Sequence, residues 1–191
     1  MAVSSTMREL GTEAPPFSLG DVRSGEMVSS DDLNAGPLLV MFICNHCPYV
    51  KHVRPGLVAL GEDYADAPID IVAISSNDAQ NYSDDAPGEL ARVAEEAGYG
   101  FPVLFDETQE VARAYGAVCT PDFFLFDADR RLVYRGQFDD SRPGREVPVT
   151  GRDLRAAMDS VLAGDPPPDE QRPSVGCSIK WKPGNEPVTI G

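Results

Sequence analysis

Residues 41–50 read M-F-I-C-N-H-C-P-Y-V, and they place two cysteines, Cys44 and Cys47, three positions apart. Two thiols at this spacing can exchange with a disulfide, can supply part of a zinc site, or can be two small buried apolar side chains. Disulfide exchange requires a thiolate, because the thiolate and not the thiol is the nucleophile. The elements on either side of the pair therefore decide between these three roles.

The residues before the pair predict a buried strand, and those after it predict a helix. Leu38 to Ile43 is continuously apolar, as expected for a central parallel strand that is buried on both faces. Pro48 suits the first turn of a helix, where its missing N–H has no intrahelical partner to lose. The helix itself is indicated by apolar residues three and four positions apart, namely Val50, Val53, Leu57, Leu60 and Tyr64.

This placement predicts a role for each residue of the pair. Cys44 ends the strand and lies next to the positive N-terminus of the helix, which stabilises a thiolate. We therefore expect Cys44 to be the nucleophile and Cys47, one helical turn further on, to resolve the mixed disulfide. Asn45 and His46 are expected to tune the pair, since a protonated His46 would favour the thiolate.

The remaining elements alternate between strands and helices. A strand at 69–75 completes a strand–helix–strand unit with a right-handed crossover. Further elements are predicted as two short strands around Ser24-Gly25, a helix at 88–97, a strand at 101–105, a helix at 108–115, a hairpin of 123–126 with 132–136, and a helix at 151–162. This order predicts an α/β domain over residues 1–163, with a central mixed sheet that is flanked by helices.

A proline-rich extension, residues 164–191, follows the last predicted helix. Apolar residues alternate across Cys177 in a pattern that suits one short strand at a sheet edge, namely Val175, Ile179 and Trp181. We expect the extension to pack back onto the domain with Trp181 as its anchor. Cys177 would then lie near Cys119 or near the C-x-x-C, and both cysteines are candidate accessory thiols for an electron relay. A packed thiol in a tight loop is the alternative for Cys119.

The composition excludes some classes of partner. The chain has 31 acidic and 16 basic residues, for a net charge of −15, so its surface repels nucleic acids and anionic membranes. The N-terminal residues show no apolar segment of a secretion signal, and the longest apolar run is too short to span a bilayer. We therefore expect a cytoplasmic protein, and in that reducing compartment a close cysteine pair is catalytic or metal-binding rather than structural. The acidic pair Asp84-Asp85 is expected on the surface.

The C-x-x-C at the end of a buried strand resembles that of the thioredoxin-like superfamily. Two further features match, since Cys119-Thr120-Pro121 directly before F-F-L-F resembles the cis-proline loop, and Pro55 resembles the proline that kinks the active-site helix. The resemblance implies a thioredoxin-like fold and thiol–disulfide exchange. It also implies that the Thr120–Pro121 peptide is cis, lies against Cys44, and presents its backbone to an incoming substrate.

Other segments narrow the resemblance to one branch. G-T-E-A-P-P-F-S-L and F-P-V-L-F-D-E-T-Q-E-V-A-R-A-Y-G-A resemble the peroxiredoxin-like group, also called alkyl hydroperoxide reductase and thiol-specific antioxidant (AhpC/TSA), over roughly residues 8–163. Peroxiredoxins carry P-x-x-x-T-x-x-C, whereas here Pro37 precedes Cys44 by seven residues and Met41 holds the threonine position. Because a thioether cannot donate a hydrogen bond to a peroxide, we expect weak or no peroxidase activity.

The sequence therefore predicts a thiol–disulfide oxidoreductase whose partner is a protein or small-molecule disulfide or thiol. No organic cofactor is expected, because the two electrons reside on the two sulfurs, and no metal is expected. Two alternatives remain, a thiol peroxidase with an antioxidant role and a non-enzymatic redox sensor or adaptor. A third is a zinc site, in which Cys44, His46 and Cys47 would be completed by Cys119, Cys177 or His52.

Overall fold

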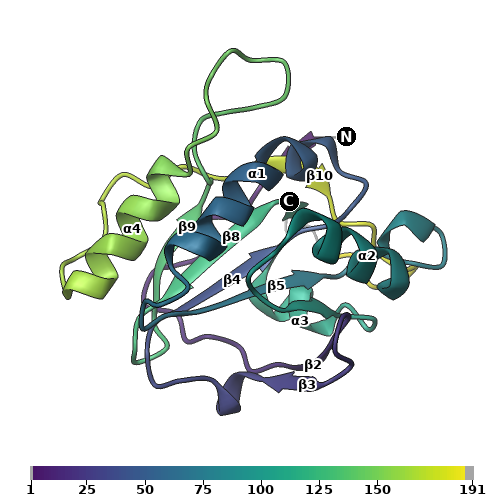
Figure 1. Ribbon diagram of the computed structural model, residues 1–191, viewed down its shortest axis with the longest axis horizontal. Helices are drawn as coiled ribbons and strands as arrows, with labels where there is room; N and C mark the ends of the chain where they lie inside the picture. The colour runs from purple at the N-terminus through teal and green to yellow at the C-terminus, as the bar shows by residue number, and fades with distance from the viewer. Residues whose placement is uncertain (1, 188–191) are drawn as a thin grey trace.

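The computed structural model describes residues 2–187. The strands of its main sheet are β2 (Ser18–Asp21), β3 (Met27–Ser29), β4 (Leu38–Phe42), β5 (Asp70–Ser75), β6 (Val103–Phe105), β8 (Asp122–Phe126) and β9 (Leu132–Gly136). They follow the order β3-β2-β6-β5-β4-β8-β9 (Figure 1). β5 pairs in parallel with β4 and with β6, whereas the other neighbours pair antiparallel. The predicted mixed sheet and the predicted N-terminal hairpin, β2 with β3, are both confirmed.

Helices cover both faces of this sheet, as the sequence predicted. α1 (Pro48–Asp63), α2 (Pro87–Ala97) and α4 (Arg152–Ala163) pack on one face, and the short α3 (Glu110–Tyr115) packs on the other (Figure 1). Pro55 lies inside α1, as the sequence predicted. None of the described helices is long and apolar enough to cross a membrane.

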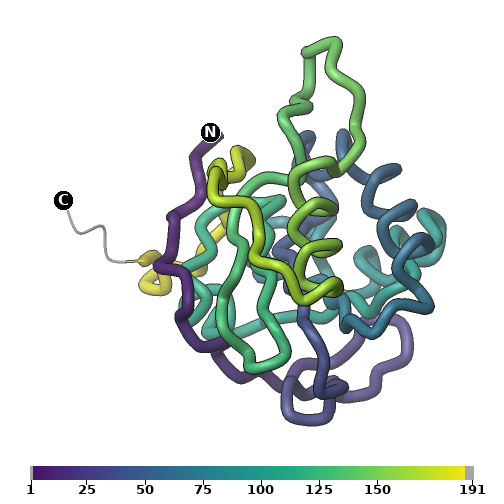
Figure 2. Tube along the Cα trace, turned by 90° about the vertical axis from the view of Figure 1, so that its left-hand side faces the viewer, coloured from purple at the N-terminus to yellow at the C-terminus, as the bar shows by residue number. Residues whose placement is uncertain are grey.

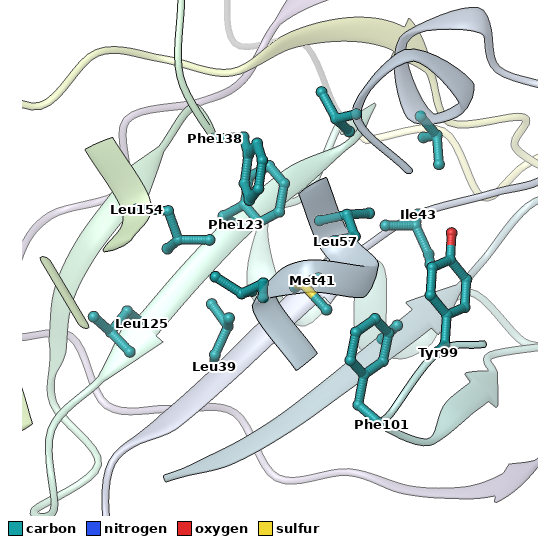
Figure 3. Packing of buried hydrophobic residues seen from close by; sticks show 14 of the residues in the cluster. Leu39, Met41, Ile43, Leu57, Tyr99, Phe101, Phe123, Leu125, Phe138 and Leu154 are labelled. Atoms are coloured by element: carbon teal, nitrogen blue, oxygen red, sulfur yellow. The ribbon is translucent and has the colours of Figure 1, made fainter. Parts of the chain in front are cut away.

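The core between α1, α4 and the sheet supports the end of β4. Leu57 of α1 and Leu154 of α4 belong to the same buried cluster as Met41 and Phe123 (Figure 3). Met41 of β4 and Phe123 of β8 are directly opposite each other in the antiparallel pair. Full burial of one such side chain contributes about 1.5–3 kcal/mol. The packing therefore holds the β4–α1 junction, where the two cysteines lie, in a rigid frame.

A second sheet joins the two ends of the described chain to its middle. Its strand order is β1 (Ala2–Ser4), β10 (Val175–Ser178) and β7 (Cys119–Thr120). The strand predicted around Cys177 is confirmed, but its predicted place at a sheet edge is wrong. β1 pairs with one side of β10 while β7 pairs with the other, so β10 is the central strand. In Figure 2 the N-terminal segment (purple) runs beside the C-terminal segment (yellow).

Two residues after β10 hold the C-terminal segment on the domain. Ile179 is 3% exposed and lies in the core cluster on the α3 face, and Trp181, the predicted anchor, packs against that cluster while partly buried. Both side chains therefore contact the core, and Ile179 is the more completely buried of the two. The end of the predicted extension, residues 188–191, lies outside the described part of the chain.

Asp122, the first residue of β8, is a carboxyl group in the protein interior. It is fully buried; its Oδ1 accepts the Phe123 N–H at 3.2 Å, and its Oδ2 has no hydrogen-bond partner among the described residues. Burial raises the pKa of this carboxyl well above its ordinary value of 3.8. The folded protein therefore holds a proton that the unfolded chain releases, so Asp122 makes the free energy of unfolding fall as the pH rises above 3.8.

We expect Asp122→Asn to remove this pH dependence. The neutral amide binds no proton in either state, so the variant should gain stability relative to the wild type as the pH rises, by up to about 1.4 kcal/mol per pH unit. Urea unfolding between about pH 4.5 and pH 7.5 measures the difference, and Asp129→Asn, at an exposed aspartate, is the matched control. If the difference in free energy of unfolding between Asp122→Asn and the wild type does not change with pH, Asp122 is not protonated in the folded protein.

Candidate redox site

Cys44 and Cys47 lie between β4 and α1, against the loop that contains Pro121. Cys47 is the N-cap residue of α1, directly before Pro48. The Cys44 sulfur is 3.2 Å from Thr120 Oγ1, and the Cys47 sulfur is 3.2 Å from the Thr120 carbonyl oxygen. The Thr120–Pro121 peptide is cis and lies against Cys44, so both parts of that prediction are confirmed. The pair is closed to solvent, with 2% of Cys44 and 0% of Cys47 exposed.

The surroundings favour a thiolate on Cys47 rather than on Cys44. The neighbouring Cys44 and then Cys177 lower the pKa of Cys47 to about 4, although the Cys47 thiol of this structure donates a hydrogen bond to the Thr120 carbonyl oxygen. The Val50 N–H, in the first turn of α1, acts in the same direction. The pKa of Cys44 is raised by the neighbouring Cys47, by burial and by the nearby Asp85 carboxylate. Cys47 is the N-cap residue and α1 begins directly after it, so the assignment of Cys44 as the nucleophile stays a prediction.

The reduced protein should contain a thiolate at a pH where an ordinary cysteine is protonated. We expect the ultraviolet absorbance of this thiolate to titrate well below pH 9.0, the ordinary pKa of a cysteine thiol. Cys47→Ser should abolish the step, whereas Cys44→Ala should move it to higher pH because the neighbour that lowers the pKa of Cys47 most is lost. A step that survives in Cys47→Ser and disappears in Cys44→Ala would place the thiolate on Cys44 instead.

A buried carboxylate, Asp85, organises the two residues between the cysteines. Its Oδ1 accepts the Asn45 N–H at 2.6 Å. Its Oδ2 accepts a hydrogen bond from the Asn77 side-chain amide at 2.9 Å and is also hydrogen-bonded to His46 Nδ1. Asp85 is fully buried, so the prediction that Asp84 and Asp85 both lie on the surface is wrong for the second of them.

Sequence reasoning missed Asp85 because the loop after β5 is polar throughout and its acidic residues look solvent-exposed. The predicted topology held a usable signal, since the carboxyl ends of the parallel strands β4 and β5 meet at the same edge of the sheet. His46 also stacks on Tyr82 of this loop, with ring centroids 5.5 Å apart. The two predicted tuning residues, Asn45 and His46, are therefore held by a loop that follows a different strand.

Three possible metal ligands meet at the site. The Cys44 sulfur, a ring nitrogen of His46 and an Asp85 oxygen lie within 4.8 Å of one another. A closed zinc site needs four ligands, and His52, a predicted fourth ligand, hydrogen-bonds Ser141 Oγ at 2.6 Å instead. Because His46 Nδ1 is already hydrogen-bonded to Asp85, these three groups form a polar network around the Cys44 thiol.

The two further cysteines point in different directions. Side chains alternate along a strand, so Cys119 points to the opposite side of β7 from Thr120, whose hydroxyl contacts Cys44. Cys119 is fully buried, its sulfur is 3.8 Å from the Pro121 carbonyl oxygen, and burial raises its pKa. Its surroundings are those of a packed thiol, whereas Cys177 packs against the buried cluster that contains the pair.

Comparisons with known proteins add a family context to this geometry. The AhpC/TSA family model matches residues 10–135. The crystal structure of an uncharacterized conserved protein from Geobacillus kaustophilus is 55% identical, with a TM-score of 0.94 over 96% of this chain and 98% of that chain. The thiol-disulfide oxidoreductase ResA of Bacillus thuringiensis is 23% identical over 65% of this chain and 68% of ResA. A thioredoxin-family thiol:disulfide interchange protein from Chlorobium tepidum shares the fold at 21% identity, with a TM-score of 0.62 over 81% of this chain and 99% of that chain.

Proposed function

The chain belongs to the AhpC/TSA family, and on this basis we propose that it is a thiol–disulfide oxidoreductase that works through Cys44 and Cys47. The observation that carries the proposal is the meeting of both sulfurs at Thr120, beside Pro121, with Cys47 at the N-terminus of α1. The similarity to ResA, a thiol-disulfide oxidoreductase, supports the same chemistry. The substrate class is a protein or small-molecule disulfide.

In the proposed reaction, the Cys47 thiolate attacks one sulfur of a substrate disulfide. A bond forms between Cys47 and that sulfur, and the other substrate sulfur leaves and takes up a proton. The Cys44 thiol then loses its proton and attacks the Cys47 sulfur, which forms the Cys44–Cys47 disulfide and releases the second substrate thiol. Two electrons pass from the pair to the substrate, so the two sulfurs supply all the electrons that the reaction needs.

This order of attack reverses the sequence prediction, in which Cys44 is the nucleophile and Cys47 resolves. The lowered pKa of Cys47 and the raised pKa of Cys44 support the reversal. Because the thiolate is the nucleophile, the first attack belongs to the sulfur that holds the negative charge. The direction of electron flow follows from the reduction potential of the pair relative to that of its compartment.

We expect the protein, with dithiothreitol as the source of electrons, to reduce insulin disulfides catalytically and to react slowly with hydrogen peroxide. Met41, in the threonine position of the peroxiredoxin motif, is a fully buried thioether that cannot donate a hydrogen bond to a peroxide. Insulin turbidity and stopped-flow oxidation measure the two rates. Rapid oxidation by peroxide without insulin turnover would favour a peroxidase. Reversible oxidation without turnover of either substrate would favour a redox sensor or adaptor.

A further inference from the structure

The backbone edge next to the cysteine pair is occupied by the protein's own C-terminal segment. β10 pairs antiparallel with β7, with Cys177 opposite Thr120 and Ser178 opposite Cys119. Residues that are directly opposite in an antiparallel pair point to the same side. Cys177 therefore points to the side on which Thr120 contacts the Cys44 sulfur. The backbone at Thr120, which the sequence predicted would receive a substrate, is therefore already paired with β10.

β10 approaches this loop so closely that only glycine fits at position 176. A methyl group on Gly176 would lie 1.9 Å from the Thr120 carbonyl oxygen and 3.2 Å from the Pro121 nitrogen. Both contacts are to backbone atoms, so no flexible side chain can move aside. The main chain of β10 thus lies directly against the loop that touches both cysteines.

Cys177 is in contact with the pair itself. Its side chain packs against the buried cluster that contains Cys44 and Cys47, and its proximity lowers the pKa of the Cys47 thiol. Burial and the neighbouring Cys47 raise the pKa of Cys177 to about 11, and the positive charge of Lys180 partly opposes this rise. Once Cys47 is part of a disulfide it carries no negative charge, so its contribution to this rise is removed. Oxidation of the pair therefore makes Cys177 a better nucleophile.

We propose that Cys177 is a third redox cysteine, which exchanges with the Cys44–Cys47 disulfide, and that β10 occupies the edge where a substrate peptide would dock. The proposal rests on the proposed function of the pair. In the exchange, the Cys177 thiolate attacks the Cys47 sulfur, so the Cys47–Cys177 bond forms and the Cys44–Cys47 bond breaks. Cys44 takes up the proton that Cys177 has lost, and no electrons enter or leave the chain.

The exchange has a consequence for access to the site. The Cys47–Cys177 disulfide would hold β10 covalently over the pair, whose sulfurs are already closed to solvent in the reduced form. A peptide disulfide would reach the pair only after β10 has moved away from β7. The redox state of the three thiols would therefore also control access to the docking edge, which is closed while the Cys47–Cys177 disulfide holds β10 in place.

The Cys44→Ala variant isolates the exchange partner of Cys47. After oxidation with diamide, a small-molecule thiol oxidant, we expect non-reducing peptide mapping to show Cys47 linked to Cys177 within one chain. Cys44→Ala/Cys177→Ser should form no intramolecular disulfide, and Cys44→Ala/Cys119→Ser should behave like its parent. A Cys47 that stays reduced, or that pairs only with Cys119 or with a second chain, would overturn the proposal.

Gly176→Ala tests whether β10 covers the pair. Because the added methyl group forces β10 away from Thr120, we expect the rate of Cys47 alkylation in the reduced protein to rise on the order of tenfold. Gly88→Ala, in α2, is the matched control, since a methyl group there meets no atom within 4 Å. Alkylation at the wild-type rate in Gly176→Ala would overturn the covering role. The peptide mapping tests whether Cys47 and Cys177 form a disulfide independently of how this variant folds.

The outcomes separate this proposal from the proposed function. A wild-type protein that fails to reduce insulin, while Cys44→Ala forms the Cys47–Cys177 disulfide, would refute the oxidoreductase and retain the third redox cysteine. Equal insulin turnover by wild type and Cys177→Ser, with no Cys47–Cys177 disulfide in Cys44→Ala, would retain the oxidoreductase and refute the third redox cysteine.

Discussion

Replacing Cys47 by serine is expected to lower the rate of insulin reduction by on the order of 10³-fold or more, because the reaction loses its nucleophile. Cys44→Ser should behave differently, since Cys47 can still attack a substrate disulfide but the mixed disulfide can no longer be resolved by its partner. That variant should accumulate covalent complexes between Cys47 and the substrate. The insulin assay measures the first effect, and non-reducing mass spectrometry measures the second.

The comparison of these two variants also decides the order of attack. If Cys44→Ser is inactive and Cys47→Ser accumulates the mixed disulfide, Cys44 attacks first. The proposed role of Cys47 as the attacking thiolate is then wrong. Cys119→Ser is the matched control, because it removes a buried thiol that points away from the pair. Its turnover should equal that of the wild type.

Asp85→Ala is expected to lower the free energy of unfolding by about 3 kcal/mol or more. The substitution leaves the Asn45 N–H, the Asn77 amide and His46 without their acceptor. A fully buried donor that loses its partner costs about 1–3 kcal/mol, which applies in full to the buried Asn77 amide and in part to the partly buried Asn45 N–H and His46. Urea unfolding measures the loss, and Asp84→Ala, at the exposed neighbour, is the matched control. A stability equal to that of the Asp84 variant would contradict the organising role of this carboxylate.

The charge of Asp85 has a separate expected effect on the chemistry. Asp85→Asn preserves the shape of the side chain but removes the negative charge that raises the pKa of Cys44. Thiolate forms of the reduced pair should become more favourable, so the reduction potential should become less negative. Equilibration with glutathione buffers measures the potential, which a purely structural role would leave unchanged. A potential identical to that of the wild type would limit Asp85 to positioning.

Much of the fold follows from local patterns in the chain. The continuous apolar run before Cys44 specified the buried strand β4, and residues spaced three and four apart specified α1. The hairpin of β8 with β9 followed from two apolar runs around a turn. These features depend on backbone propensity and side-chain periodicity within about ten residues, which is why they are visible without a structure. The cis peptide at Pro121 was predicted from the resemblance together with the position of Thr120-Pro121 directly before the β8 strand, where a proline costs no ladder hydrogen bond.

The sequence by itself identified the pair Cys44 and Cys47 and the loop at Thr120, but only the tertiary structure shows what surrounds the two sulfurs. Those surroundings include the N-terminus of α1, which begins after Cys47, and groups from distant segments, Asp85 and Cys177. The pairing of β10 between β1 and β7 likewise joins residues that are far apart along the chain. Such contacts arise from the topology of the folded chain rather than from local periodicity, so only the structure could show that the third thiol lies against the pair.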